Sequence, residues 1–415
     1  MRSLADVPRD ARLLFASRML RMFAYGQLAV VLPLYLTAAG LTGGQIGLLV
    51  GLALIGDTLV TLTITSTADR IGRRKALLIG GALLACTGVC LGLGTGLTLL
   101  LIVATLGVVS PSGYEVGPFL SVEQAGLTQI VASHRRTWVF AWYNLVGSFS
   151  TALGSLVGGA AVQALQGRGV AELTSCRALL GGYSVIGGVL IALALAMSSV
   201  VEPPAASASE TRSLRRNWIG LGASKGVVAK LAGLFAIDAF GGGFVLQSMI
   251  VYWFKVKYDA DPATLGAIFF GANILAGISS LSAAWVASKI GLINTMVFTH
   301  LPSNLLLMLV PVMPSMETAI LVLLLRFSIS QMDVPTRQSY TMAIVAPEER
   351  SAAGGVTGVA RTVGASLSPF IAGPMLAQAA LRSVPFFVSG ALKIVYDLLL
   401  WRSFKAHKPP EESIP

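Results

Sequence analysis

Charged residues are scarce in this sequence: Asp, Glu, Lys and Arg make up 12% of its 415 residues, whereas soluble domains contain about 25%. Long polar segments are also rare, because apolar runs of about 20 residues, enough to cross a bilayer, recur along almost the whole chain. These two features exclude a water-soluble globular protein. We expect instead a protein whose main solvent is lipid.

The sequence also lacks the signatures of cofactor and metal chemistry. Its three cysteines lie in an apolar segment (Cys86 and Cys90) or in a short loop (Cys176), so neither a disulfide framework nor a metal site is expected. No phosphate-binding P-loop is present, which leaves the chain without an ATP-driven motor. We therefore predict no enzyme, no cofactor and no metal. The three histidines have no ligand or relay spacing and are interpreted as incidental (His134, His300 and His407).

Apolar periodicity predicts an all-α membrane protein with twelve transmembrane helices. The longest non-apolar stretch, residues 200–228, divides these helices into six plus six. We therefore predict an N-terminal bundle (1–199), a cytoplasmic linker (200–228), a C-terminal bundle (229–408) and a tail (409–415). The expected spans are 14–39, 45–68, 76–96, 99–126, 137–163, 178–199, 229–254, 262–287, 292–313, 318–343, 352–376 and 384–404.

Basic residues indicate how the helices are oriented, because Lys and Arg are enriched in cytoplasmic loops. With both termini inside, 20 of the 30 Lys and Arg residues fall in cytoplasmic segments, 5 in outside loops and 5 within spans. We therefore expect a multi-pass protein of the cell membrane with both termini cytoplasmic. The net charge of +11 is then a topology signal, and a nucleic-acid partner is not expected.

The two halves of the sequence resemble each other. Residues 123–136, "EQAGLTQIVASHRR", align with 337–350, "RQSYTMAIVAPEER", at an offset of 214, and "TADRIG" (67–72) aligns with "VASKIG" (286–291) at 219. This pattern predicts two homologous, pseudo-symmetric six-helix bundles. Transporters are commonly built from such repeats, with the substrate site near the membrane midplane.

Two short motifs make the chain resemble the major facilitator superfamily. "TSTADRIGRRK" (65–75) matches most of the family's loop signature, and "GSLVGG" (154–159) resembles an antiporter motif but has Ser155 in place of a proline. The resemblance implies a conformational latch in which an acid contacts the start of helix 11. The small residues of "ALGSLVGGA" also permit close helix packing. The expected latch residues are Asp69, Arg70, Gly72, Arg73 and Arg74.

Ionisable residues inside the spans are costly and usually face a partner or a water-filled cavity. The resemblance implies that helices 1, 4, 7 and 10 line the central cavity, and several of these residues fall on those helices. Arg21 and Asp238 occupy nearly equivalent repeat positions and are expected to pair across the bundles. Lys393 and Asp397, four residues apart on helix 12, are expected to neutralise each other. The predicted substrate and proton residues are Arg21, Asp57, Glu115, Asp238, Arg326, Asp333, Arg337 and Arg361.

Helix 10 contains the most polar of these segments, "SQMDVPTRQSY" (330–340). At 100° per residue, Arg326, Asp333 and Arg337 share one narrow face. Asp333 and Arg337 have the i,i+4 spacing of an ion pair. Pro335 removes one helix hydrogen bond and is expected to kink the helix. Two interpretations stay open: a buried pair that locks the helix, or a direct role in substrate or proton handling.

These observations predict a secondary active transporter that moves a small organic solute by alternating access. Proton-coupled efflux, an antiport, is the favoured mode, and Glu115, Asp57 and Asp238 are the protonation candidates. The alternative is proton-linked uptake of an anionic metabolite, which Arg326, Arg337 and Arg361 would favour. A remote alternative is a membrane sensor that does not transport. The expected partners are the solute, protons and membrane lipid, and the chain is expected to be a monomer.

Overall fold

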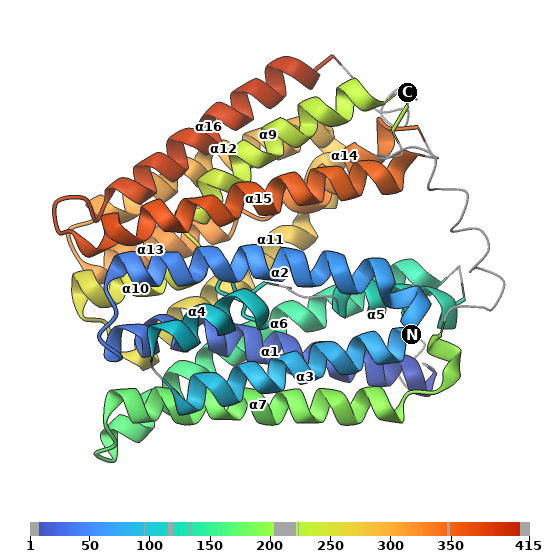
Figure 1. Ribbon diagram of the computed structural model, residues 1–415. Coiled ribbons are helices and arrows are strands. Elements are labelled where there is room, and N and C mark those ends of the chain that lie inside the picture. The colour runs from blue at the N-terminus through green and yellow to red at the C-terminus, as the bar shows by residue number, and fades with distance from the viewer. Residues whose placement is uncertain are drawn as a thin grey trace. The chain divides into compact units, whose positions relative to one another are not determined.

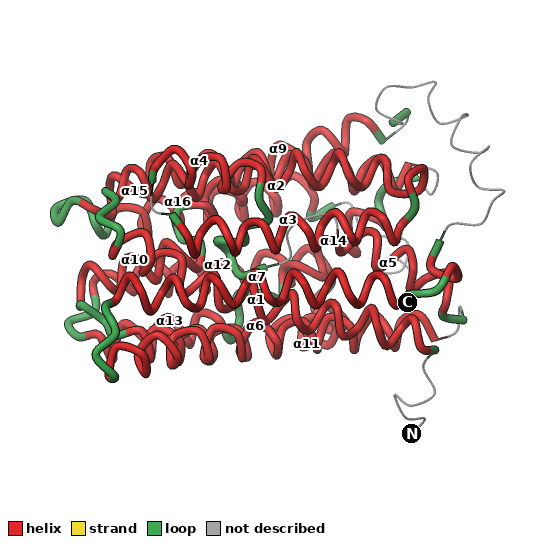
Figure 2. Tube along the Cα trace, turned by 60° about the horizontal axis from the view of Figure 1, so that its bottom comes forward, coloured by secondary structure: helices red, strands yellow, loops and turns green. Residues whose placement is uncertain are grey.

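The computed structural model describes residues 8–94, 96–114, 119–132, 135–202, 221–222, 224–346 and 349–406. These residues are almost entirely helical and contain no strand (Figure 2). Within them, nine helical segments are long and apolar enough to cross a membrane. The prediction of an all-α membrane protein is therefore confirmed. The predicted linker (200–228) and tail (409–415) lie largely or wholly outside the described residues.

The chain divides into two compact units. Unit 1 contains α1, most of α2, α3–α7 and the first part of α11 (259–270). Helix α1 packs against α6 and α7, and α3 packs against α7, as the long parallel ribbons in Figure 1 show. The helices that begin in this unit are α1 (Arg9–Ala38), α2 (Gly43–Ile71), α3 (Arg73–Leu93), α4 (Leu97–Leu106), α5 (Phe119–Ile130), α6 (Arg136–Gly167), α7 (Glu172–Ala196) and the short η3 (Ser199–Val201).

Unit 2 contains the first turns of α2 (42–51), helices α9 and α10, the rest of α11 and all the later helices. Helix α9 packs against α15 and α16, and α12 packs against α13, α14 and α16. The helices of this unit are α9 (Lys225–Gly243), α10 (Gln247–Tyr258), α11 (Pro262–Ile290), α12 (Leu292–Leu309), η5 (Val310–Val312), α13 (Met316–Phe327), α14 (Asp333–Ala343), α15 (Arg350–Ala377) and α16 (Val384–Phe404).

The helix boundaries reproduce the sequence repeat. Helices α6 and α15 begin 214 positions apart, at Arg136 and Arg350. Helices α3 and α12 begin 219 positions apart, at Arg73 and Leu292. A glycine with positive φ precedes each of these two helices: Gly72 at 101° and Gly291 at 83°. The same turn therefore recurs at equivalent positions of the two halves.

The predicted spans 4 and 10 are each formed by two shorter helices. In span 10, α13 ends at Phe327 and α14 begins at Asp333, with turns between them. The predicted single, kinked helix is wrong at this point. Pro335 lies in the first turn of α14, where a missing backbone N–H costs no helix hydrogen bond. The proline is therefore compatible with a new helix rather than a bend in a continuous one.

Small residues let helices α1 and α6 approach closely. An ideal Cβ added to Gly26 would lie 2.0 Å from Thr151 O, and one added to Gly154 would lie 1.9 Å from Phe23 O. Ser155, which replaces the expected proline, donates to Gly26 O at 3.1 Å. The predicted packing role of "ALGSLVGGA" is confirmed.

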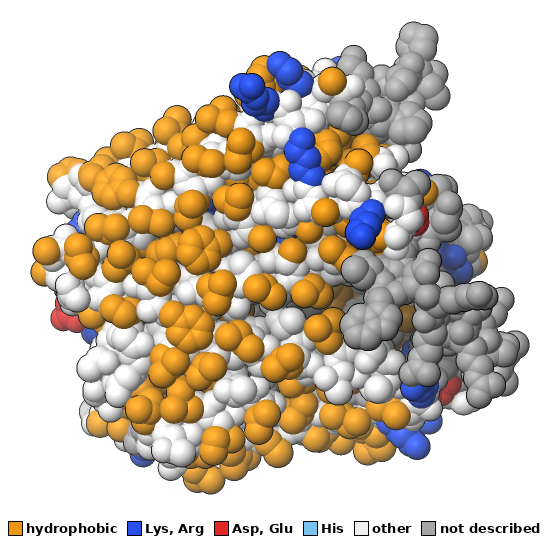
Figure 3. All heavy atoms as spheres, turned by 45° about the horizontal axis from the view of Figure 1, so that its top comes forward, with side chains coloured by type: hydrophobic (Ala, Val, Ile, Leu, Met, Phe, Trp, Pro, Cys, Tyr) orange, Lys and Arg blue, Asp and Glu red, His pale blue; other side chains and the backbone are white. Residues whose placement is uncertain are grey.

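The surface is as apolar as the composition predicts. Hydrophobic side chains are spread over the face turned to the viewer in Figure 3. Single side chains are widely exposed: Leu93 at 79%, Trp285 at 68% and Val185 at 66%. In water such exposure would be costly, whereas lipid tails solvate these side chains.

Candidate functional site

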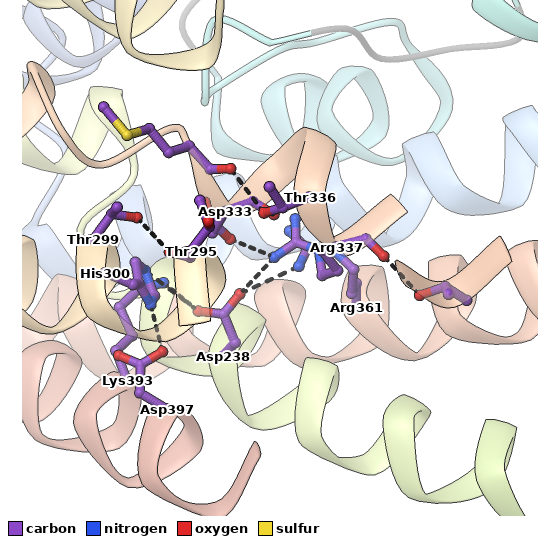
Figure 4. Close-up of polar contacts among 12 residues, drawn as sticks. Asp238, Thr295, Thr299, His300, Asp333, Thr336, Arg337, Arg361, Lys393 and Asp397 are labelled. Carbon is purple, nitrogen blue, oxygen red and sulfur yellow. Dashed lines mark hydrogen bonds and ion pairs between the residues drawn. The ribbon is translucent and has the colours of Figure 1, made fainter. Parts of the chain in front are cut away.

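A buried carboxylate, Asp238 of α9, contacts three cations in unit 2. Lys393 Nζ of α16 donates to its Oδ1 at 2.6 Å. Arg361 Nη1 of α15 and Arg337 Nη1 of α14 lie 3.2 Å and 3.4 Å from its Oδ2. The Asp238 side chain is only 4% exposed. Three helices therefore place cations on one carboxylate of α9, which lies between His300 and Lys393 on one side and the two arginines on the other (Figure 4).

The local sequence of α9 makes room for this arrangement. An ideal Cβ on Gly242 would lie 3.6 Å from Lys393 Nζ, and one on Gly241 would lie 3.3 Å from Lys393 Cγ. The glycines of "FGGGF" therefore allow the stem of Lys393 to pass close to α9. The same glycines end α9 at Gly243, and α10 begins at Gln247.

The predicted pair within α14 is confirmed. Arg337 Nη1 donates to Asp333 Oδ2 at 2.7 Å, and both side chains are 7% exposed. The same guanidinium nitrogen also faces Asp238. Arg337 therefore connects the local i,i+4 pair to the carboxylate that α15 and α16 share.

Arg361 differs from the other charged members of the cluster in its exposure. Its side chain is 34% exposed, whereas those of Arg337 and Lys393 are 7% and 10% exposed. A guanidinium is planar and matches the geometry of a carboxylate or phosphate group. Arg361 is therefore the cation of this cluster best placed to reach a solute.

Two members of the cluster were not expected from the sequence. His300 Nδ1 of α12 lies 2.9 Å from Asp397 Oδ1, and Asn304 Nδ2 donates to Asp397 Oδ2 at 3.0 Å. The predicted pair of Lys393 with Asp397 is wrong, because Lys393 points to Asp238 and Asp397 to His300. The interpretation of His300 as incidental is also wrong. The polar i,i+4 spacing of His300 and Asn304 in an apolar helix was the available signal.

Unit 1 contains a separate ionic cluster. Arg21 of α1 forms two hydrogen bonds to Glu123 of α5, at 2.7 Å and 2.8 Å. Ser17 donates to the same carboxylate at 2.6 Å, and the Tyr143 hydroxyl contacts its other oxygen. Both charged side chains are fully buried. Arg21 therefore binds a carboxylate of its own unit, and its pairing with Asp238 across the bundles stays a prediction.

Three other predicted residues remain: Asp57, Arg326 and Glu115. Asp57 is half-buried in the middle of α2 and accepts a hydrogen bond from Thr61 at 3.3 Å. Arg326 is buried in the last turn of α13, where its guanidinium lies 4.9 Å from the centre of the Phe327 ring. Glu115 lies outside the described residues. The roles of all three in proton or substrate handling stay predictions.

The predicted latch residues surround the turn between α2 and α3. Glu202, just after η3, accepts the backbone N–H groups of Arg73 at 2.6 Å and Arg74 at 3.2 Å. The Arg73 guanidinium donates to Gln129 Oε1 of α5 at 2.8 Å. The turn is thus tied to α5 and to the segment after α7 within unit 1. This anchoring role of Glu202 was not expected from the sequence.

Two further latch residues, Asp69 and Arg70, lie in the last turn of α2. Arg70 lies in the exposed last turn of α2. The side chain of Asp69 is outside the described residues, and so is that of Ser351 near the start of α15. The expected contact between the acid and helix 11 therefore stays a prediction.

A repeated fold of membrane-spanning helices with buried ionic clusters is typical of transporters. The family model of the Major Facilitator Superfamily matches residues 14–369, and the chain belongs to this family.

Known proteins agree with this assignment. The chain is 29% identical to the uncharacterized membrane protein YJR124C of Saccharomyces cerevisiae, a match that covers 94% of this chain and 93% of the yeast protein. It is 28% identical to the multidrug efflux protein YfmO of Bacillus subtilis over 40% and 41% of the two chains. The crystal structure of nucleoside transporter NupG aligns with a TM-score of 0.72 at 15% identity, covering 96% of this chain and 100% of that one. The NupG likeness shows the fold alone.

Proposed function

We propose that this protein is a secondary active transporter that moves a small organic anion together with protons by alternating access. The observation that carries the proposal is the contact between Asp238 and the part-exposed Arg361. Arg361 can exchange this internal carboxylate for an anionic group of a solute. The expected location, a cell membrane with both termini cytoplasmic, belongs to the same proposal.

Charge balance favours an anion over a cation as the solute. The contacts connect three carboxylates, Asp238, Asp333 and Asp397, with three cations, Arg337, Arg361 and Lys393. Adding one proton leaves a positive charge in excess, which an anionic solute would neutralise. Proton binding and anion binding then strengthen each other, and this coupling is reciprocal. A cationic solute would instead have to compete with three cations for Asp238.

Proton-coupled efflux, the mode that the sequence favours, is the second candidate. It is supported by the similarity to the multidrug efflux protein YfmO. Half-buried Asp57 of α2 would be its natural proton carrier, because a carboxylate in contact with solvent can exchange protons.

The two candidates differ in a proteoliposome assay. We would impose a pH gradient and offer labelled succinate and glucose 6-phosphate as anions and tetraphenylphosphonium as a cation, and subtract the passive uptake measured in liposomes without protein. Anion–proton symport predicts that at least one anion accumulates on the alkaline side. Accumulation of the cation on the acidic side would support antiport. If no solute responds to the gradient, proton coupling is wrong.

Arg361 provides the matched test of the site. Arg361→Gln is expected to weaken transport of the anion at least tenfold while leaving the melting temperature nearly unchanged, since its side chain is one-third exposed. The control is Arg382→Gln. In the wild type, Arg382 donates to Leu376 O and Val256 O, away from the cluster. Equal transport by both variants would remove Arg361 from the site.

A further inference from the structure

The imidazole of His300 lies between two carboxylates, with one ring nitrogen directed at each. Its Nδ1 is 2.9 Å from Asp397 Oδ1, and its Nε2 is 4.0 Å from Asp238 Oδ1. The His300 side chain is 5% exposed, and Asp397 is fully buried. Figure 4 shows the ring in this position beside Lys393.

This geometry favours a proton beyond those of a neutral histidine and two ionised carboxylates, because each ring nitrogen is directed at a carboxylate oxygen. A neutral imidazole carries one N–H and can donate to only one side, so its second nitrogen directs a lone pair at an anion. An imidazolium donates on both sides and removes this repulsion. A protonated carboxyl group facing the acceptor nitrogen does the same. In either form the group of three binds one additional proton.

We infer that His300 and Asp397 form the proton-binding site of the transporter and act on the solute site through Asp238. This inference rests on the proposed function and assigns its coupling proton to α12 and α16. The proton comes from water on one side of the membrane, binds to the imidazole–carboxylate pair and leaves to water on the other side. No other bond is made or broken.

Asp238 is the link between this pair and Arg361. When His300 carries the proton, its positive charge interacts with Asp238 Oδ1, the atom that also accepts from Lys393 at 2.6 Å. The hold of Asp238 on Arg361, 3.2 Å away through Oδ2, then weakens. Arg361 becomes available to an anionic solute. Loss of the proton returns Arg361 to Asp238 and favours release.

Charged and titratable groups on neighbouring helices affect the proton affinity of His300. Asp238 faces it from α9, and Lys393, Tyr396 and Asp397 face it from α16, with the Tyr396 ring centre 6.2 Å away. From α14, Asp333 and Arg337 lie on the far side of Asp238 (Figure 4). From α13, Arg326 is the buried charged residue. Charges of both signs therefore surround His300, so the sign of each substitution effect can be predicted.

The chain offers a clean spectroscopic test, because it has only three histidines. In H134Q/H407Q, labelled with [15N]histidine, a single imidazole signal reports His300. We expect it to change between protonated and neutral forms between pH 5 and pH 9. Asp397→Asn should lower the midpoint by about one pH unit, a tenfold change in proton affinity, because it removes an anion. Arg361→Gln should raise the midpoint, because it removes a competing cation.

A purely structural histidine gives a different result. A signal that stays in one protonation state over this range, or a midpoint that neither variant moves, would overturn the inference. These readings need no transport and no known solute, so they are independent of the proposed function.

A transport experiment uses whichever anion of the proteoliposome assay the wild-type protein accumulates. His300→Gln is expected to lose accumulation driven by the pH gradient at least tenfold and to keep anion–anion exchange, which needs no net proton movement. Full accumulation by this variant overturns the inference and leaves the proposed function intact. Loss of exchange in a variant that still folds also overturns it. If the wild type itself accumulates no anion, the proposed function fails while the titration still tests the proton site.

Discussion

The two units each contain a buried ionic cluster, but the clusters are closed in different ways. In unit 1, Arg21 and Glu123 bind each other through two hydrogen bonds and both are fully buried. In unit 2, Asp238 serves three cations at distances from 2.6 to 3.4 Å, and one of these cations, Arg361, is 34% exposed.

The two clusters differ in how many cations compete for one carboxylate. In unit 1 both oxygens of Glu123 bind one guanidinium, so the simplest role of this contact is to hold α1 and α5 together. A carboxylate shared by three cations can strengthen one contact as another weakens, with little movement of the helices. We therefore expect the unit 1 pair to be replaceable as a pair and the unit 2 cluster to resist such replacement.

The largest expected effect comes from removing the shared carboxylate. Asp238→Asn leaves Lys393, Arg337 and Arg361 without their common anion in a buried site. Removing one partner of a buried ionic contact typically costs about 3–5 kcal/mol. The free energy of unfolding, followed by tryptophan fluorescence in detergent, should fall by that amount. A loss below about 1 kcal/mol would show that Asp238 does not hold unit 2 together.

The second prediction tests whether the unit 1 pair is replaceable. Glu123→Gln strands Arg21 and should lower the free energy of unfolding by about 3 kcal/mol. Combining Arg21→Met with Glu123→Leu should recover stability to within about 1 kcal/mol of the wild type, because apolar pairs often replace buried ion pairs. Transport should survive in the double variant.

The matched double variant in unit 2 should behave differently. Asp238→Leu with Lys393→Met removes one pair but leaves Arg361 without the carboxylate it contacts, while Arg337 keeps only Asp333, so no recovery is expected. If both double variants recover equally, the distinction between a closed pair and a shared carboxylate is wrong.

Patterns in the sequence were sufficient to predict some of this architecture. The repeat offsets of 214 and 219 recur in the helix starts, and the i,i+4 spacing of Asp333 and Arg337 gives a real ion pair. The first signal compares two distant segments of the chain, and the second is a spacing within one helix. The i,i+4 spacing alone does not decide the partner, because Lys393 and Asp397 have the same spacing on α16 and bind other residues.

Partners on different helices could not be found in this way. Lys393 lies four residues from Asp397 but contacts Asp238, which is 155 positions away. His300 contacts Asp397 across 97 positions. The angular argument that grouped Arg326 with Arg337 assumed one continuous helix, whereas turns separate α13 from α14. A break of a few residues resets the direction of every later side chain, and periodicity cannot detect it.

The third prediction compares equivalent turns of the two halves. Gly72 and Gly291 both have φ in the left-handed region, at 101° and 83°. Replacing either with alanine should cost about 1–2 kcal/mol. Gly72→Ala should cost more, because its Cβ would lie 3.2 Å from the Glu202 carboxylate that caps α3. An equal loss in both variants, measured by the same unfolding assay, would mean that the Glu202 contact adds nothing.

The smallest expected effect concerns two helix caps at equivalent repeat positions, Asp261 before α11 and Thr42 before α2. Asp261 accepts from the Thr264 backbone N–H at 2.8 Å and from its hydroxyl at 2.6 Å, and Thr42 accepts from the Gln45 N–H at 3.3 Å. Partial burial acts to raise the pKa of Asp261, but the hydrogen bonds from Thr264 outweigh it and hold the pKa below its ordinary value of 3.8.

A depressed carboxyl pKa stabilises the folded state above the ordinary pKa, and this contribution is lost as the pH falls through the folded value. Asp261→Ala should therefore cost about 1 kcal/mol at pH 7, and its difference from the wild type should shrink in acid below pH 3.8. Thr42→Ala should cost a similar amount that is independent of pH. Unfolding curves at pH 7 and pH 3 test this prediction. If Asp261→Ala lowers the free energy of unfolding as much at pH 3 as at pH 7, the charge of this exposed carboxylate contributes nothing to stability, unlike the buried charge of Asp238.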